Sequence, residues 1–168
     1  MLSEETLLVV DGYNIIHQWA CFQKSKLLSL EDARDHLISL LAELKAATRT
    51  RILVVFDGQG PVGDDAEIQG VRVKYSPKGK TADSIIEKIS KEKGKKESVV
   101  VATSDGMIQQ QILGYGALRV SARELEKYWE NMTKQQEKAR RLRNGSSKKL
   151  SGQIPKGLEQ KLRDTFTD

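Results

Sequence analysis

The stretch LLVVDG at residues 7–12 indicates the fold class, because a short apolar run ends directly in an Asp-Gly dipeptide. The same pattern recurs as ILVVFDG at residues 52–58 and as VVVATSDG at residues 99–106. Short runs rich in β-branched residues and bounded by turn signals are typical of strands buried on both faces. We therefore predict strands at residues 7–10, 52–56, 71–75 and 99–102, with a weaker fifth at residues 117–120.

Helical patterns lie between these strands, each with apolar residues on one face. The three sets are Leu30, Ala33, Leu37, Leu41 and Leu44; Ile85, Ile86 and Ile89; and Ile108, Ile112 and Leu113. Alternating strands and helices predict right-handed crossovers and a mainly parallel sheet of about five strands with helices on both faces. The expected fold class is therefore three-layer α/β/α.

The last helix is expected to begin near Ser121, where Ser121 and Glu124 have the spacing of a capping box. The residues Asn144-Gly145-Ser146-Ser147 are expected to end it, and Pro155 is expected to open a short helix. We therefore predict one domain at residues 1–143 and a basic tail at residues 144–168.

Length and composition exclude several classes of protein. With 168 residues and 38% hydrophobic residues, the chain is sized for one domain with a core, so disorder throughout is excluded. The single cysteine, Cys21, cannot form an internal disulfide or a thiolate zinc site. The N-terminus lacks a basic region and a long apolar run, so we expect no signal peptide, no membrane association and a cytoplasmic location.

Positive charge is concentrated near the C-terminus. Residues 133–163 contain ten basic and two acidic residues, a net charge of +8 within a chain whose total is +5. Such a segment suits a polyanion, because each neutralised phosphate releases condensed counterions. The alternative is a solvated helix face with no partner.

Three of the predicted strands end in an aspartate, at Asp11, Asp57 and Asp105. In an open parallel sheet these ends share one edge, so the carboxylates should converge. Oxygen ligands without clustered Cys or His favour Mg²⁺ or Mn²⁺ over zinc. Asp83, at the start of a predicted helix, is a fourth candidate. For each residue the structural alternative is an ordinary turn or helix cap.

The sequence Asp11-Gly12-Tyr13-Asn14 directly after the first strand resembles the signature of NYN domain ribonucleases of the PIN-like superfamily. The order and spacing of four further motifs are similar to the YacP-like branch. These motifs are Phe56-Asp57, Thr81-Ala82-Asp83, the stretch ATSDG at residues 102–106 and the stretch GALRVSAREL at residues 116–125. The resemblance covers about residues 7–143 and implies a PIN-like fold.

The resemblance implies a metal-dependent endoribonuclease with an acidic cluster of Asp11, Asp57, Asp83 and Asp105. Asn14 would orient Asp11 or a metal-bound water. The resemblance to the YacP-like branch also implies cleavage of messenger RNA in the A site of the translating ribosome, so the expected partners are RNA and the ribosome. No small-molecule organic cofactor is expected, and a Gly-x-x-x-x-Gly-Lys nucleotide site is absent from the sequence.

Several residues are candidates for contact with RNA or the ribosome. Lys78 and Lys80 suit phosphates and Tyr115 suits base stacking, although loop solvation would explain them equally well. The remaining candidates are Arg119, Arg123, Lys138, Arg140, Arg141 and Arg143.

Two other functions compete with the nuclease. The first is a noncatalytic RNA- or ribosome-binding module with a nuclease-like fold. The second is a phosphatase or phosphoacceptor domain, which is disfavoured because Tyr13 occupies the place of a second aspartate and no proline follows a lysine. A metal-free nuclease driven by histidine is also disfavoured, because His17, expected in a loop, and His36, expected in a helix, suit packing or surface positions.

Overall fold

The computed structural model describes residues 2–24, 29–58 and 65–150, with side chains described up to Asn144. The chain divides into two units, Met1–Met132 and Thr133–Asp168. The first contains the sheet and the start of the last helix, α6 (Ala122–Leu150), and the second contains the rest of that helix. The expected boundary between residues 143 and 144 stays a prediction.

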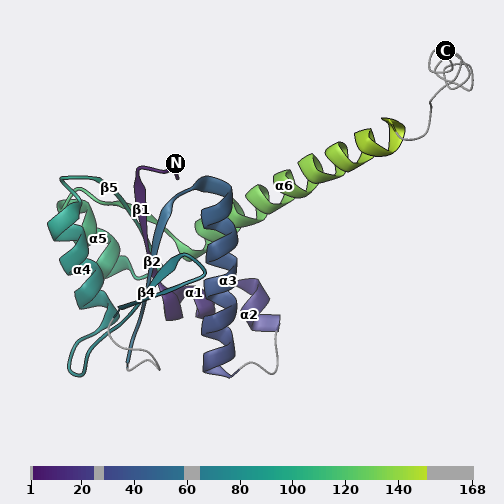
Figure 1. The fold of residues 1–168 in the computed structure, drawn as a ribbon. Helices are drawn as coiled ribbons and strands as arrows, with labels where there is room; N and C mark the ends of the chain where they lie inside the picture. Colours follow the sequence, from purple (N-terminus) through teal and green to yellow (C-terminus); the bar gives the residue numbers. More distant parts are fainter. Residues whose placement is uncertain (1, 25–28, 59–64, 151–168) are drawn as a thin grey trace, which may run out of the picture. The chain divides into compact units, whose positions relative to one another are not determined.

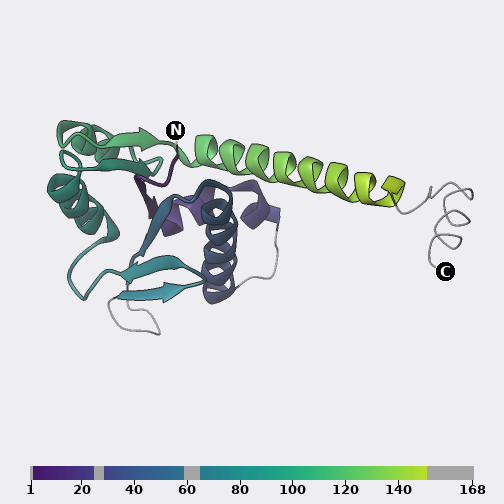
Figure 2. The ribbon, with the colours of Figure 1, turned by 45° about the horizontal axis from the view of Figure 1, so that its top comes forward.

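Six strands form one sheet in the order β3-β4-β2-β1-β5-β6 (Figure 1). They are β1 (Thr6–Asp11), β2 (Arg51–Phe56), β3 (Asp65–Ile68), β4 (Val71–Tyr75), β5 (Ser98–Ala102) and β6 (Leu118–Val120). All neighbouring strands run parallel except β3 and β4, which form an antiparallel pair (Figure 2). The three-layer α/β class and all five predicted strands are confirmed.

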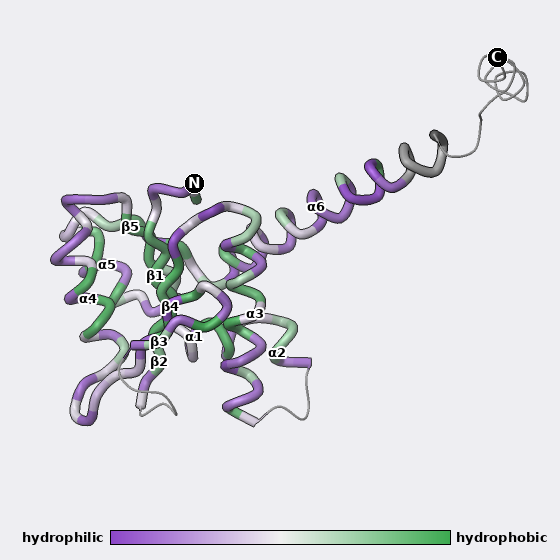
Figure 3. Tube along the Cα trace, viewed as in Figure 1, coloured by the Kyte–Doolittle hydropathy of each residue, from purple (hydrophilic) through white to green (hydrophobic). Residues whose placement is uncertain are grey.

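Helices cover both faces of the sheet (Figure 1). The first face carries α1 (Gly12–Gln18), α2 (Ala20–Lys24) and α3 (Leu30–Thr48), and the second carries α4 (Ala82–Lys93) and α5 (Gly106–Gly114). In β1, Leu8 and Val10 join the first core while Leu7 and Val9 join the second. Because both faces are buried, the central strands are continuous apolar runs, which Figure 3 shows in green.

The strand β3 is one more than the sequence predicted. Its residues alternate between exposed and half-buried, because it lies at the sheet edge beside β4. A four-residue edge strand buried on one side lacks the apolar run by which the other strands were recognised.

The segment after β1 is also helical, which corrects the expectation that His17 lies in a loop. His17 lies in the last turn of α1 and is exposed. His36 lies in α3 as expected, and its ring packs against Phe22 with ring centroids 5.3 Å apart. The short, seven-residue α1 gave too little periodicity to be recognised.

The predicted start of α6 is confirmed, because the Glu124 carboxylate accepts hydrogen bonds from the backbone N–H and the hydroxyl of Ser121, both at 2.7 Å. The predicted end is wrong, because α6 continues through residues 144–147 to Leu150. One glycine costs a helix about 1 kcal/mol and does not by itself end it. The short helix expected at Pro155 lies outside the described residues.

Candidate functional site

The end of β1 places a carboxylate in a nearly closed environment. Asp11 is 8% exposed and is flanked in the sheet by β2 and β5. Burial raises its pKa from 3.8 to about 6, and the charges of Asp83 and Asp57 act in the same direction. The Thr103 hydroxyl, which donates to Asp11 Oδ2 at 3.1 Å, partly offsets this rise. The nearby backbone N–H of Asn14 does so too, without forming a capping hydrogen bond.

A second carboxylate comes from the first turn of α4. Thr81 caps this helix by accepting from the Ser84 backbone N–H at 3.2 Å, so Asp83 is not needed as the cap. Burial raises the pKa of Asp83, and the charges of Asp105 and Asp57 raise it further. The four predicted aspartates therefore lie close enough to act on one another electrostatically, as convergence at one sheet edge predicted.

The carboxylates of Asp57 and Asp105 also accept hydrogen bonds from neighbouring backbone and side-chain groups. Asp57 Oδ1 accepts from the Ala82 N–H at 2.5 Å and from the Ser76 hydroxyl at 3.3 Å, which ties the loop after β2 to the start of α4. Asp105 Oδ1 accepts from the backbone N–H groups of Met107 at 2.8 Å and Ile108 at 3.3 Å and thereby caps α5. The helix-cap alternative is therefore correct for part of the role of Asp105.

The chemistry of this cluster suits a hard cation. All donors are carboxylate oxygens, and the raised pKa values of Asp11 and Asp83 show that adding negative charge here is unfavourable. Among the residues that the structure describes, however, no three Asp, Glu, His or Cys side chains already have the spacing of a metal-binding group. The carboxylates thus influence one another's pKa values, but several of them could bind one ion only after their side chains adjust.

Asn14 connects two parts of this edge. Its side-chain Oδ1 accepts from the Ser104 backbone N–H at 2.8 Å, so the amide holds the loop after β5 against α1. Ser104 in turn accepts, through its hydroxyl, from the Ala122 N–H at the start of α6, at 3.1 Å. Asn14 therefore positions the loop that carries Asp105, in addition to its electrostatic effect on Asp11.

Thr103 was not singled out from the sequence as a site residue. Its side chain is fully buried, donates to Asp11 and accepts from the Asp105 backbone N–H at 3.1 Å. It therefore fixes two of the carboxylate-bearing segments relative to each other. A small hydroxyl residue directly after a buried strand, two positions before an aspartate, was the available signal.

The packing around Gly12 explains why a glycine follows Asp11 in the first of the three Asp-Gly pairs. A Cβ atom there would overlap the ring of Phe56. That ring lies 5.2 Å from the Tyr13 ring, measured between centroids, and the Tyr13 hydroxyl accepts from Arg34 Nη1 at 3.0 Å. The close approach of α1 to β2 thus requires glycine after Asp11.

Lys78 and Lys80 are brought close to the carboxylate edge. Both are exposed in the loop between β4 and α4. They line a depression of about 330 Å³ together with Gly58 and Ser76. Gly58 follows Asp57 in the sequence, and the Ser76 hydroxyl donates a hydrogen bond to Asp57 Oδ1. These two predicted lysines therefore lie near Asp57, at the same edge of the sheet as the carboxylates.

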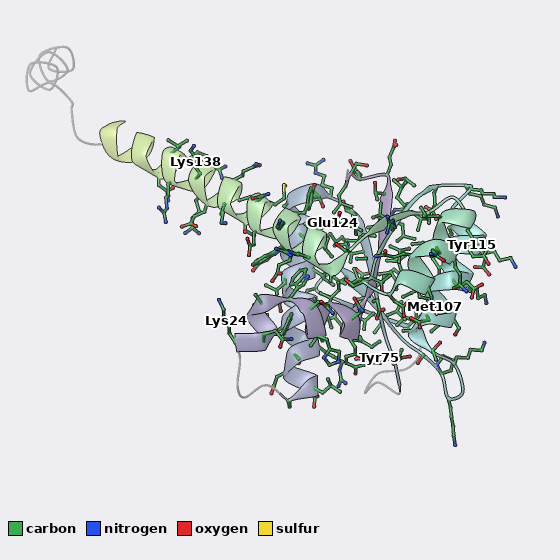
Figure 4. The ribbon with its side chains drawn as sticks, turned by 180° about the vertical axis from the view of Figure 1, so that it is seen from behind. Lys24, Tyr75, Met107, Tyr115, Glu124 and Lys138 are labelled. Carbon is green, nitrogen blue, oxygen red and sulfur yellow. The ribbon has the colours of Figure 1, made fainter. Side chains whose placement is uncertain are left out.

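Tyr115 is not brought to the carboxylates. It lies at the opposite end of α5 from Asp105, and Figure 4 shows it at the other end of this helix from Met107. Its hydroxyl donates to Glu87 Oε1 at 2.9 Å, and this partner raises the pKa of the phenol. Helices that follow parallel strands run back toward the other sheet edge, which accounts for the separation.

Two of the predicted arginines lie on nearby elements. Arg119 is exposed on β6 and donates to Gln109 Oε1 at 2.7 Å, and Gln109 Nε2 donates to the Thr103 carbonyl oxygen at 2.6 Å. Arg119 is therefore linked through one side chain to the loop after β5. Arg123 is exposed in the first turn of α6, next to Ala122.

The remaining basic candidates lie in the second unit. The exposed residues are Lys138, labelled in Figure 4, and Arg140, Arg141 and Arg143. Arg141 forms an ion pair with Glu137 on the same helix. Within residues 2–24, 29–58 and 65–150, none of the helices combines the length and apolar character that crossing a membrane requires.

Comparisons with known proteins identify the family to which this chain belongs. The sequence profile of the YacP-like NYN domain matches residues 8–167. The chain is 38% identical over 163 residues to the Bacillus subtilis (strain 168) protein described as "Uncharacterized protein YacP", covering 95% of this chain and 94% of that protein.

Two crystal structures of Rae1 (YacP) from Bacillus subtilis have the same fold. One matches with a TM-score of 0.69 and 38% identity, covering 95% of this chain and 91% of the other. The second, of a tryptophan-to-leucine mutant of that protein, matches with a TM-score of 0.69 and 37% identity, covering 92% and 89%. The profile match and the relatives together show that this chain belongs to the YacP-like NYN domain family, with its nuclease-like fold.

Proposed function

We propose that this protein is a metal-dependent endoribonuclease that hydrolyses RNA phosphodiester bonds. The observation that carries the proposal is the Asp11 carboxylate, which is 8% exposed, has a pKa raised to about 6 and is repelled by Asp83 and Asp57. A bound cation would offset both the burial and the repulsion. Oxygen donors alone suit Mg²⁺ or Mn²⁺.

Asp11 and Asp83 would hold the metal, with Asp57 and Asp105 contributing the oxygens Oδ2, since their Oδ1 atoms accept the hydrogen bonds described above. The bound ion would neutralise charge on the phosphate and lower the pKa of a nucleophilic water. Thr103 holds Asp11 in place, and Asn14 holds the loop that carries Asp105. The products would carry a 5′-phosphate and a 3′-hydroxyl.

The proposed substrate is messenger RNA in the A site of the translating ribosome. Lys78 and Lys80 would contact phosphates beside the carboxylates, and Arg119 and Arg123 would contact RNA nearby. The α6 residues Lys138, Arg140, Arg141 and Arg143 would bind RNA of the message or the ribosome. Support comes from the family relationship and from the net charge of +8 over residues 133–163.

The experiment is a map of messenger RNA 5′ ends in a translating extract with Mg²⁺. The intact protein should generate new 5′-phosphate ends in a fixed relation to the reading frame. Asp11→Asn should generate none, and blocking initiation should remove them. A matched control is Glu43→Gln, which removes the same charge from an exposed position on α3 and should leave cleavage unchanged.

One observation favours a second candidate, a noncatalytic RNA- or ribosome-binding module. Asp57 and Asp105 are engaged in helix contacts, and the described side chains show no metal-binding group of three. Cosedimentation of both the intact protein and Asp11→Asn with ribosomes, without new 5′ ends, would favour this module over the nuclease.

A further inference from the structure

A pocket of about 540 Å³ lies between β4 and α4 and has no role in the proposed metal chemistry. Its lining includes three lysines, one glutamate and two isoleucines: Lys74, Lys80, Lys88, Glu92, Ile85 and Ile89. Its volume is in the range of small-ligand sites. A site of this size can take one nucleotide.

The position of the pocket links it to the carboxylates. Thr81 and Ser84, on either side of Asp83 in the sequence, both line it. Lys80 lines both this pocket and the depression of about 330 Å³ that reaches Gly58, the residue after Asp57. An RNA strand whose phosphate lies at Asp83 would therefore have a neighbouring nucleotide within reach of the pocket.

The pocket lining has a net positive charge, with three lysines and one glutamate, and the lysines are weakly paired. Lys88 Nζ lies 3.9 Å from Glu92 Oε1, and Lys74 Nζ lies 3.9 Å from Asp65 Oδ2. The Lys88 and Glu92 side chains are 71% and 58% exposed, so this pair contributes little stability. Lys88 can therefore change partner and meet a phosphate with little loss.

The wall of the pocket is apolar. Ile85 is buried and Ile89 half-buried against the second core. Tyr75 contributes to the lining from β4, but its ring packs in the first core on the other face of the sheet, stacked on Phe56 with ring centroids 5.7 Å apart. An apolar wall can cover the face of an unstacked base while neighbouring ammonium groups bind its phosphate. A metal ion would use neither the lysines nor the apolar wall.

We infer that this pocket is a subsite for one nucleotide of the RNA strand, next to the phosphate held at the carboxylates. The inference rests on the proposed ribonuclease function and extends it by naming where a flanking nucleotide is held. The base lies against Ile85 and Ile89, and its phosphate is bound by Lys88 and Lys80.

The test measures binding of a fluorescently labelled single-stranded RNA oligonucleotide to the full chain in EDTA, by anisotropy. Lys88→Glu should raise the Kd about tenfold, whereas Glu92→Lys should lower it about threefold. The matched control Lys96→Glu reverses the same charge at an exposed position after α4 and should change the Kd less than about twofold. A merely structural role would move both pocket variants in the same direction.

The outcomes separate this inference from the function on which it rests. If the protein cleaves RNA in Mg²⁺ but all three variants bind RNA like the parent, the subsite is wrong and the nuclease stands. If the Kd shifts in the two expected directions without cleavage in Mg²⁺, the subsite stands and the nuclease is wrong. If Lys88→Glu weakens adenosine 5′-monophosphate binding but not RNA binding, the pocket takes free nucleotides, and the assignment to the RNA strand is overturned.

Discussion

Asp11 and Asp105 follow neighbouring parallel strands and begin the same Asp-Gly dipeptide, yet their surroundings differ. Asp105 Oδ1 caps α5 through two backbone N–H groups. Asp11 makes no such cap, is 8% exposed and has a pKa raised to about 6. Local structure therefore accounts for much of Asp105, whereas the burial of Asp11 is unfavourable by itself and supports the proposed cation. The same motif can mark a helix start or a reactive position.

The largest expected effect is the difference in RNA cleavage between variants of Asp11 and of Asp105. Asp11→Asn should reduce Mg²⁺-dependent RNA cleavage by at least about 100-fold, because it removes a metal-binding charge. Asp105→Asn should reduce it by only about tenfold, because the amide oxygen still caps α5. Initial cleavage rates measure this, with circular dichroism to verify folding. Equal losses would show that the two strand ends are equivalent.

The pH dependence of stability should sharpen the same contrast. The folded-state pKa of Asp11, about 6, lies above the ordinary value of 3.8, so the folded protein binds this proton more tightly than the unfolded chain. The associated stability is fully present below pH 3.8 and is lost as the pH rises through about 6. The shift corresponds to about 3 kcal/mol.

Urea unfolding in EDTA, measured between about pH 4 and about pH 8, tests this expectation. The free energy of unfolding of Asp11→Asn should fall less over this range than that of the parent protein, by about 2 kcal/mol, because at pH 4 part of the effect is already lost. Asp105→Asn should retain most of the parent's dependence. If Asp11→Asn keeps the full pH dependence of the unfolding free energy, titration of other groups causes that dependence.

The glycines after the two aspartates should also differ. Gly12→Ala should destabilise the protein by about 1–3 kcal/mol, because the new Cβ would overlap the Phe56 ring. Gly106→Ala should be neutral or slightly stabilising, because no atom lies within 4 Å of a Cβ built there. Thermal unfolding of the pair measures the difference, and similar losses in both would contradict the close approach at Gly12.

The smallest effect concerns the cap itself. Asp105→Ala should lower the free energy of unfolding by about 1 kcal/mol relative to Asp105→Asn, because alanine cannot accept from the Met107 and Ile108 N–H groups. Denaturant titration of the two variants at one pH measures this. Equal stability would mean that the capping hydrogen bonds contribute nothing net.

Much of the fold could be predicted from local sequence. The five parallel strands and the cap at Ser121 follow from apolar runs and spacing, whereas β3 and α1 are too short or too exposed to produce a clear period. The convergence of the aspartates follows from parallel topology. The same rule places the C-terminal end of α5 at the other edge, so the position of Tyr115 was predictable from the strand order.

The partners within the site could not be predicted in this way. Thr103 bonds to Asp11, and Asn14 bonds to Ser104, across 92 and 90 positions of sequence. These contacts depend on β1 lying next to β5, a pairing that no local pattern specifies. Whether an aspartate caps a helix or is buried without a cap likewise depends on tertiary surroundings.

The pairing of β1 with β5 also bears on synthesis of the chain. Asp11 is translated early, but its neighbours Thr103 and Asp105 and the Ala122 N–H that anchors Ser104 are translated much later. A nascent chain therefore lacks an assembled carboxylate edge until residue 122 of the 168 has emerged. A protein proposed to cut messages on ribosomes would thus remain inert toward its own message for most of its translation.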